Sequence, residues 1–233
     1  MAQFLNELNE AQRVAVEKID GPVMVIAGAG SGKTRVLTYR IAYLLDKGVD
    51  AFNILSLTFT NKAAREMKER VGRIVGDGEA KNLWMGTFHS VFAKILRIEA
   101  ERLGYPTNFT IYDADDSKKL ITTIIKEKQL DKDIYKAKSV SSRISSLKNN
   151  LITPKAYFQN GELQAQDSTA KMPMFGEIYQ AYTERCFRAG AMDFDDLLLK
   201  TNELLYKFPE VLAKYQNRFK SVSYTHLRAH ETG

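Results

Sequence analysis

Eight residues near the N-terminus have the composition of a loop that binds phosphate. They run from Ala27 to Thr34 and read Ala-Gly-Ala-Gly-Ser-Gly-Lys-Thr. Glycines allow a tight turn whose backbone N–H groups point at phosphate oxygens, and a following helix adds its positive N-terminal end. In such a loop the lysine reaches the β- and γ-phosphates, and the next hydroxyl is a ligand for Mg²⁺. The sequence therefore predicts a nucleotide site in which Lys33 and Thr34 are catalytic and Thr34 holds the metal.

The residues around the loop support this interpretation. The apolar run Val23–Ile26 predicts a buried strand before it, and a helix is expected from Gly32 to Lys47, ended by Gly48. Ala27 stands where the strict pattern has glycine, but a small residue keeps the turn possible. The alternative is a glycine-rich turn with a chance Gly-Lys-Thr. The residues predicted to bind the phosphates are Ala27, Gly28, Ala29, Gly30, Ser31, Gly32, Lys33 and Thr34.

Strands and helices continue to alternate after the loop. Buried strands are expected over Ile54–Phe59 and Leu83–Thr87, and helices over Lys62–Val75 and Phe88–Leu103. Parallel strands joined by crossover helices explain this order best. The sequence therefore predicts an α/β fold with a parallel sheet.

From about Ile111 the pattern changes to successive helices without clear buried strands. We expect a helical domain over 111–192, inserted into the α/β domain, which resumes at 193–220. The residues Asp193, Asp195 and Asp196 are of metal-ligating types, but a cap for the following helix is the better interpretation. The expected helices are 113–128, 139–148, 174–189 and 194–206.

The segment between Lys132 and Lys155 is strongly basic. Six lysines and arginines accompany one acidic residue, Asp133, and five serines lie among them. Amines and hydroxyls suit contacts to DNA phosphates, but such a run is also typical of a solvated face, and both interpretations stay open. The basic residues are Lys132, Lys136, Lys138, Arg143, Lys148 and Lys155.

Composition limits the class of protein. The chain has 233 residues, enough for one or two domains, and its net charge of +6 fits a polyanionic partner. The single cysteine, Cys186, cannot form an intramolecular disulfide, which favours a reducing cytoplasm. A place on a helix face suits Cys186 better than the role of a nucleophile. No apolar run has membrane-spanning length, and the N-terminus lacks the apolar region of a signal peptide.

The last 13 residues, Ser221 to Gly233, differ from the pattern before them. They have neither helical nor strand periodicity, and they resemble one reading frame of a transposon-end adapter used in sequencing libraries. A genuine polar tail is the alternative. We interpret the segment as foreign to the fold, so its two histidines, His226 and His230, are not read as metal ligands.

Five motifs occur in one order along the chain. Together they resemble superfamily 1 DNA helicases of the UvrD/Rep/PcrA type, and the resemblance covers residues 4–220. They are Leu8-Asn9-x-x-Gln12, the loop 27–34 with Arg35, Thr58-Phe59-Thr60-Asn61-Lys62-Ala63-Ala64, Gly86-Thr87-Phe88-His89-Ser90 and Asp193-Phe194-Asp195-Asp196-Leu197.

The resemblance implies a RecA-like P-loop NTPase domain over 1–110 and 193–220, with the helical domain inserted. It implies a motor that uses ATP and Mg²⁺ to move along single-stranded DNA and to unwind duplex junctions 3′ to 5′. Gln12 resembles the residue that reads adenine, and Arg35 the arginine that lies near the base, where its planar guanidinium can stack. An exposed helix residue and a surface charge are the respective alternatives.

Two of the motifs resemble segments that contact single-stranded DNA. One supplies Phe59, Thr60 and Asn61, and the other supplies Thr87, Phe88 and His89. Both follow expected strands, at the edge where open α/β sheets bind ligands. The alternatives are a core role for Phe59, capping by Thr60 or Asn61, and a structural role for His89.

The resemblance also implies parts that these motifs do not include. The acidic metal-binding motif and the arginine fingers of the family would lie beyond Lys220. We therefore expect a helicase fragment that does not turn over ATP alone. A subunit of a helicase-nuclease and a non-catalytic nucleotide- or DNA-binding module are the alternatives.

Overall fold

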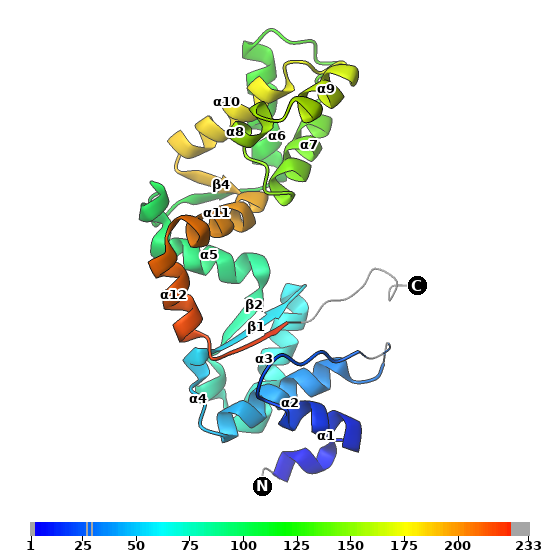
Figure 1. Cartoon of the computed structure of the whole chain (residues 1–233), viewed down its shortest axis with the longest axis vertical. Helices are drawn as coiled ribbons and strands as arrows, with labels where there is room; N and C mark the ends of the chain where they lie inside the picture. The colour runs from blue at the N-terminus through cyan, green and yellow to red at the C-terminus, as the bar shows by residue number, and fades with distance from the viewer. Residues whose placement is uncertain (1–2, 27, 29, 225–233) are drawn as a thin grey trace. The chain divides into compact units, whose positions relative to one another are not determined.

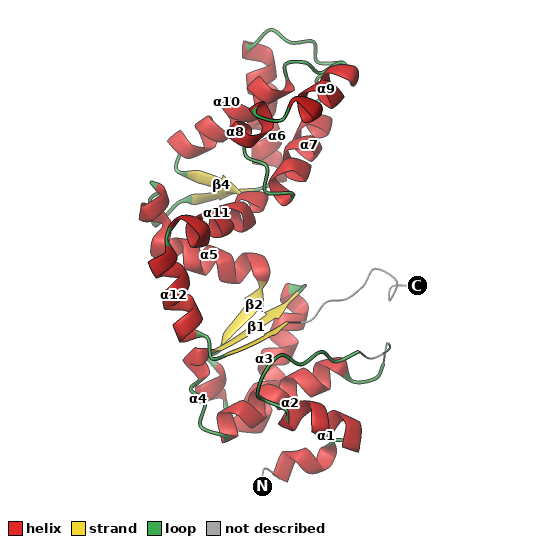
Figure 2. Cartoon of the chain, viewed as in Figure 1, coloured by secondary structure: helices red, strands yellow, loops and turns green. Residues whose placement is uncertain are grey.

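The computed structural model describes residues 3–26, 28 and 30–224. The chain forms two compact units, one from Met1–Val91 with Pro209–Gly233 and the other from Phe92–Phe208. Figure 1 follows the chain through both units, and Figure 2 shows that helices predominate. Among the described residues, no helix is both long and apolar enough to cross a membrane.

The first unit is an α/β structure. Its sheet has three parallel strands in the order β2–β1–β5, and Leu55 of β1 lies opposite Trp84 on one side and Val222 on the other. This confirms the expected parallel sheet. Its elements are the 3-10 helices Gln3–Glu7 and Ala51–Asn53, α1 (Glu10–Glu17), α2 (Lys33–Asp46), β1 (Ile54–Thr58), α3 (Asn61–Val75), α4 (Asp77–Ala80), β2 (Trp84–Thr87), the start of α5 (Phe88–Glu99), α12 (Pro209–Arg218) and β5 (Ser221–Tyr224).

Local signals start and end the helices of this unit. The Asn9 side chain accepts a hydrogen bond from the Gln12 N–H at 2.9 Å, and Thr60 Oγ1 accepts one from the Ala63 N–H at 3.1 Å. Both bonds satisfy N–H groups that a helix leaves unpaired in its first turn. Every residue of β1 is buried. The core beside it is formed by Leu37, Ile41, Leu44, Ala51, Ile54, Met67, Val71, Ala80 and Leu83.

The prediction of a strand just before the glycine-rich loop is wrong. Val23–Ile26 is coil, and the side chains of Met24 and Ile26 are 85% and 89% exposed. A strand needs a neighbour for its backbone N–H and C=O groups, and both edges of β1 are already taken by β2 and β5. The outer edges of β2 and β5 are not paired with this run either, so within the described part of the chain it belongs to no sheet.

The expectation that the sequence from Ser221 onward lacks strand structure is wrong for its first four residues. Ser221–Tyr224 forms β5, which pairs in parallel with β1 from Ile54 to Leu57. The segment has only a weak periodic signal of its own, because the pairing with β1 depends on residues far away in sequence. His226 and His230 lie outside the described residues.

We expect β5 to stabilise the first unit measurably. A chain ending at Lys220 should lose roughly 2–4 kcal/mol of unfolding free energy relative to a chain ending at Tyr224, because several ladder bonds of about 0.5–1.5 kcal/mol each are removed. Urea unfolding can be followed by the fluorescence of Trp84, the only tryptophan. Its ring lies 5.3 Å from that of Phe219, just before β5. Equal stability of the two chains would show that β5 contributes nothing.

The second unit is mainly helical. It also contains a two-stranded parallel sheet, in which β3 pairs with β4, and this was not expected from the sequence. Its elements are the rest of α5, the 3-10 helix Ala100–Leu103, β3 (Thr110–Tyr112), α6 (Ala114–Glu127), α7 (Ala137–Asn149), α8 (Pro154–Phe158), α9 (Gly161–Thr169), α10 (Phe175–Arg188), β4 (Ala191–Asp193) and α11 (Phe194–Lys207).

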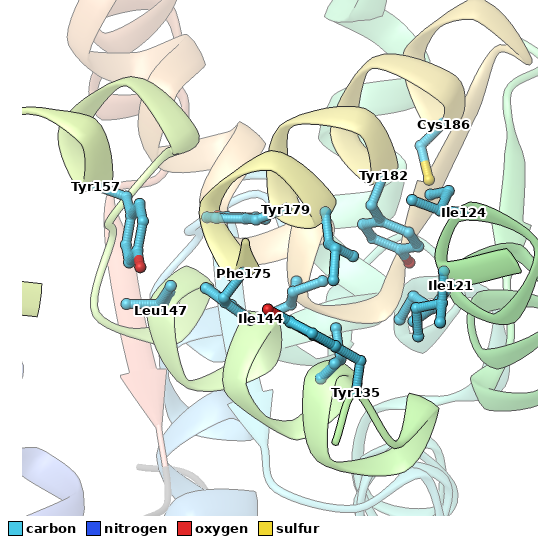
Figure 3. Close-up of a cluster of buried hydrophobic side chains, with 13 residues drawn as sticks. Ile121, Ile124, Tyr135, Ile144, Leu147, Tyr157, Phe175, Tyr179, Tyr182 and Cys186 are labelled. Atoms are coloured by element: carbon cyan, nitrogen blue, oxygen red, sulfur yellow. The ribbon is translucent and has the colours of Figure 1, made fainter. Parts of the chain in front are cut away.

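Aromatic and branched aliphatic side chains form the core of this unit (Figure 3). Tyr179 and Tyr182 of α10 are almost fully buried, and burial raises the pKa of the Cys186 thiol to about 12. A thiol with so high a pKa is a poor nucleophile at neutral pH. Cys186 is therefore a core residue on a helix face, as predicted.

The second unit extends beyond the expected inserted domain of 111–192. It spans Phe92–Phe208 because β3 pairs with β4 and because α11 packs against α7. Asp193 caps α11 by accepting a hydrogen bond from the Asp196 N–H at 2.8 Å, and the Asp196 side chain accepts one from the Asp193 N–H at 3.1 Å. Capping was the interpretation favoured for these aspartates.

Candidate nucleotide site and nucleic-acid interface

The glycine-rich loop leads directly into the N-terminus of α2. Gly30 and Gly32 have φ values of +76° and +85°, a left-handed conformation that favours glycine. A Cβ atom at Gly32 would also come within 2.8 Å of Gln12 Nε2. The positive φ therefore favours glycine at position 32, and a larger residue would also displace the end of the Gln12 side chain. Ala27 and Ala29, two of the predicted phosphate-binding residues, lie outside the described residues.

Two side chains of the loop bind one of its own carbonyl groups. Ser31 Oγ donates to the Gly28 carbonyl oxygen at 2.6 Å, and Lys33 Nζ donates to the same oxygen at 3.2 Å. The Lys33 ammonium group thus lies against the loop. The first-turn N–H groups of α2, where Thr34 follows Lys33, add partial positive charge at this end of the helix.

Gln12 reaches the loop from α1. Its Nε2 donates to the Ser31 carbonyl oxygen at 3.2 Å, while its Oε1 accepts from the Asn9 N–H at 3.3 Å. The alternative of an isolated, exposed helix residue does not hold, since Gln12 is half-buried against the predicted site. Recognition of the adenine base by Gln12 stays a prediction.

Arg35 extends from α2 to the N-terminal 3-10 helix. Its Nη2 donates to the Glu7 carbonyl oxygen at 2.9 Å and to the Glu7 carboxylate at 3.2 Å. The Tyr39 hydroxyl donates to the same carboxylate, and burial, together with that carboxylate, raises the pKa of Tyr39. Tyr39 could have been found from the sequence, because it lies four residues after Arg35 on the same helix face. Glu7 could not, because no spacing rule links it to Arg35. The stacking role of Arg35 stays a prediction.

The sheet brings the two predicted DNA-contacting segments together. In the parallel register Thr58 of β1 lies opposite Thr87 of β2, so the residues after both strands share the carboxyl edge of the sheet. Phe59 is 68% exposed, which excludes the core role considered for it. An exposed aromatic ring at this edge can stack on an unpaired base.

The remaining residues of this edge have partly structural roles. Thr60 caps α3, as expected, and Thr87 Oγ1 accepts a hydrogen bond from the Ser90 N–H at 3.2 Å at the start of α5. Asn61 is exposed, while Phe88 and His89 are half-buried. DNA contact by all of these residues stays a prediction.

The basic segment 132–155 is less available to DNA than its charge count suggests. Lys148 is only 2% exposed, and its Nζ lies 2.7 Å from Asp193 Oδ2 and 2.8 Å from Asp196 Oδ1. Arg143 forms a two-bond ion pair with Asp167 at 3.1 and 3.2 Å. The interpretation of a uniform phosphate-contacting run is wrong for these two residues, because each is neutralised within the second unit.

Comparison with known proteins identifies the family of the chain. A family model, the UvrD/REP helicase N-terminal domain, matches residues 8–223. The ATP-dependent DNA helicase PcrA of Staphylococcus aureus (strain Mu50 / ATCC 700699) is 45% identical over 223 residues, which are 95% of this chain and 30% of that protein. PcrA of Staphylococcus epidermidis (strain ATCC 12228 / FDA PCI 1200) is 44% identical over 223 residues, which are again 95% of this chain and 30% of that protein.

The chain spans about 30% of the length of these curated relatives. The family match ends at Ser223 and so includes most of β5. Because the match covers most of the described residues and all five motifs, the chain belongs to the UvrD/REP helicase N-terminal domain family.

Proposed function

We propose that this chain is the N-terminal ATP-binding part of a DNA helicase that moves 3′ to 5′ along single-stranded DNA and unwinds duplex junctions. The observation that carries the proposal is the convergence of Gln12 and Lys33 on the glycine-rich loop at the start of α2. The named relatives are ATP-dependent DNA helicases, which supports the same conclusion.

The residues of the loop fit a nucleotide with its metal ion. Lys33 would hold the β- and γ-phosphates, and the first-turn N–H groups of α2 would orient them. Thr34 would hold Mg²⁺, which supplies positive charge between the phosphates when bound. Among the described residues, no cluster of three His, Cys, Asp or Glu side chains could hold a metal. That this chain alone does not turn over ATP remains our prediction.

Single-stranded DNA is the partner proposed for the carboxyl edge of β1 and β2. The exposed lysines that remain in the basic segment, Lys132, Lys136, Lys138 and Lys155, would suit duplex phosphates. The cytoplasmic location expected from the cysteine count stays a prediction.

The Phe59 ring provides the sharpest test of the DNA site. Replacing Phe59 with alanine should weaken single-strand binding by roughly 1–3 kcal/mol, since one stacking surface is lost. Fluorescence anisotropy with a labelled oligonucleotide measures the effect. Phe52 is a matched control: it is 46% exposed and lies just before the opposite end of β1.

The affinity of the unaltered chain should fall as salt concentration rises, because bound phosphates release counterions. Phe52→Ala should bind as the unaltered chain does. Equal affinity of a folded Phe59→Ala variant and the unaltered chain would remove the stacking role, and binding insensitive to salt would remove the phosphate contacts.

A further inference from the structure

A cavity in the second unit lies far in sequence from the glycine-rich loop. It has a volume of about 420 Å³ and is formed mainly by α8, α10 and α11. Its size falls within the range of about 300–1,000 Å³ that is usual for ligand pockets. The polar residues that matter for its chemistry are Lys155, Thr183, Lys200, Glu203 and Lys207.

The cavity carries an excess of positive charge. Lys200 and Lys207 share the Glu203 carboxylate, at 2.8 and 2.5 Å. Burial would raise the pKa of Glu203, but the hydrogen bonds from both lysines outweigh it and lower that pKa, so Glu203 is ionised at neutral pH. Lys155 is exposed and has no carboxylate at ion-pair distance in the described part of the chain. Three ammonium groups against one carboxylate leave two positive charges.

The Lys148 ammonium, which also lines the cavity, does not add to this excess. It lies between two carboxylates, Asp193 and Asp196, at 2.7 and 2.8 Å, so with both ionised this cluster carries one negative charge and reduces the net charge around the cavity to one positive charge. The excess charge therefore belongs to the three lysines of α8 and α11. Lys200 and Lys207 reach a ligand by loosening or sharing their ion pairs with Glu203.

The cavity wall also contains a hydroxyl without a partner. Thr183 Oγ1 is buried and has no hydrogen-bond partner among the described residues. A buried hydroxyl without a partner is unfavourable, so such groups are normally satisfied by protein, water or ligand. The wall thus contains a neutral donor beside the positive charges, and its oxygen, which has almost no exposed surface, reaches a ligand once the Thr183 side chain turns.

We propose that this cavity binds a phosphate-type oxyanion, held by Lys155, Lys200 and Lys207 and by a hydrogen bond from Thr183. The net positive charge favours an anion, and phosphate oxygens accept charge-assisted hydrogen bonds from ammonium groups. A second hollow of about 480 Å³ shares Pro154, Lys155 and Thr183 with the cavity and is also lined by Phe158. This space suits the organic part of a phosphate ester, whether free or within a DNA backbone.

The test uses backbone amide NMR shifts of the chain carrying Lys33→Ala, which removes the phosphate ligand of the glycine-rich loop. Inorganic phosphate and a short single-stranded oligonucleotide are titrated separately. We expect saturable shifts of the Thr183 amide and its neighbours. Lys155→Gln with Lys207→Gln should weaken this binding by at least about tenfold, because two charge-assisted bonds are lost. Thr183→Val should weaken it as well.

Lys118→Gln with Lys126→Gln is the matched control. It removes the same charge from exposed positions of the same unit that do not line the cavity, and it should leave the affinity within about twofold. If only inorganic phosphate causes shifts, the ligand of the cavity is a free oxyanion. If both probes cause shifts, the cavity also binds a phosphate of the DNA backbone. The absence of saturable shifts with either probe would overturn the proposal. So would an equal loss of affinity in the control.

Discussion

Replacing Lys33 with alanine is expected to lower the DNA-stimulated ATPase rate of the complete helicase by at least about 100-fold, the usual effect of losing one aligned charge donor. Lys33 Nζ lies 3.2 Å from the Gly28 carbonyl oxygen, in the loop whose N–H groups would hold the phosphates. Negative charge develops on the leaving-group oxygens toward the transition state, so the lost ammonium group affects rate more than affinity. Phosphate release measured with and without single-stranded DNA gives the rates.

Lys47→Ala is the matched control for this variant. Lys47 caps the opposite end of α2 and is exposed, with its ammonium group 5.1 Å from the Tyr43 ring. It should keep the full rate, while Lys33→Ala should keep its fold and its affinity for DNA. A rate within about twofold of the unaltered enzyme in Lys33→Ala, with folding confirmed by circular dichroism, would exclude the loop as the site of hydrolysis.

The helices that the sequence predicts correctly have local signals, whereas α4, α8, α9 and α12 were not predicted. The caps at Asn9, Thr60, Asp113 and Asp193 all bind an N–H group two or three residues away. Such bonds are visible in the order of the residues alone. The loop and the start of α2 follow from the same kind of local pattern.

Strand pairing is the part of the fold that local sequence patterns do not predict. Val23–Ile26 has the apolar run of a buried strand but lacks a neighbour, whereas Ser221–Tyr224 looks polar and still pairs with β1. Thr110 and Ala191 are 81 positions apart by their numbers and are paired in the small second sheet. A strand forms only where a partner accepts its hydrogen bonds, and the partner is not encoded nearby.

Counting charges along the sequence also fails at the candidate sites, because the partners of a charged residue can lie far away in sequence. Lys148 looks like one more residue of a basic run, but its partners Asp193 and Asp196 lie more than 40 positions further along the chain. Arg35 looks like a free guanidinium beside the loop, but it is bound to Glu7. Composition shows which charges a segment has, and only the fold shows which of them are neutralised.

The buried ammonium group of Lys148 joins three elements of the second unit. It extends from α7 to the Asp193 carboxylate at the end of β4 and to the Asp196 carboxylate on α11. Tyr182 of α10 donates to the same Asp193 oxygen at 2.8 Å. Burial would lower the pKa of Lys148, but the two carboxylates outweigh burial and raise it, so the lysine stays charged at neutral pH.

Replacing Lys148 with methionine should therefore destabilise the chain by about 3–5 kcal/mol, the typical cost of removing one partner from a buried ion pair. Methionine has a similar length and fills the same space, so the loss would come from two carboxylates left without a cation. Urea unfolding followed by far-ultraviolet circular dichroism measures it. Lys132→Met, at an exposed position of the same unit, should stay within about 0.5 kcal/mol.

A triple variant separates charge from packing. Adding Asp193→Asn and Asp196→Asn to Lys148→Met removes both unpaired charges, and asparagine can still cap α11. Replacing a buried ion pair by neutral groups of similar volume is often nearly neutral, so the triple variant should regain most of the lost stability. If it is no more stable than Lys148→Met, the loss comes from packing. If Lys148→Met itself loses less than about 1 kcal/mol, the carboxylates reach water and the ion pair does not hold the three elements together.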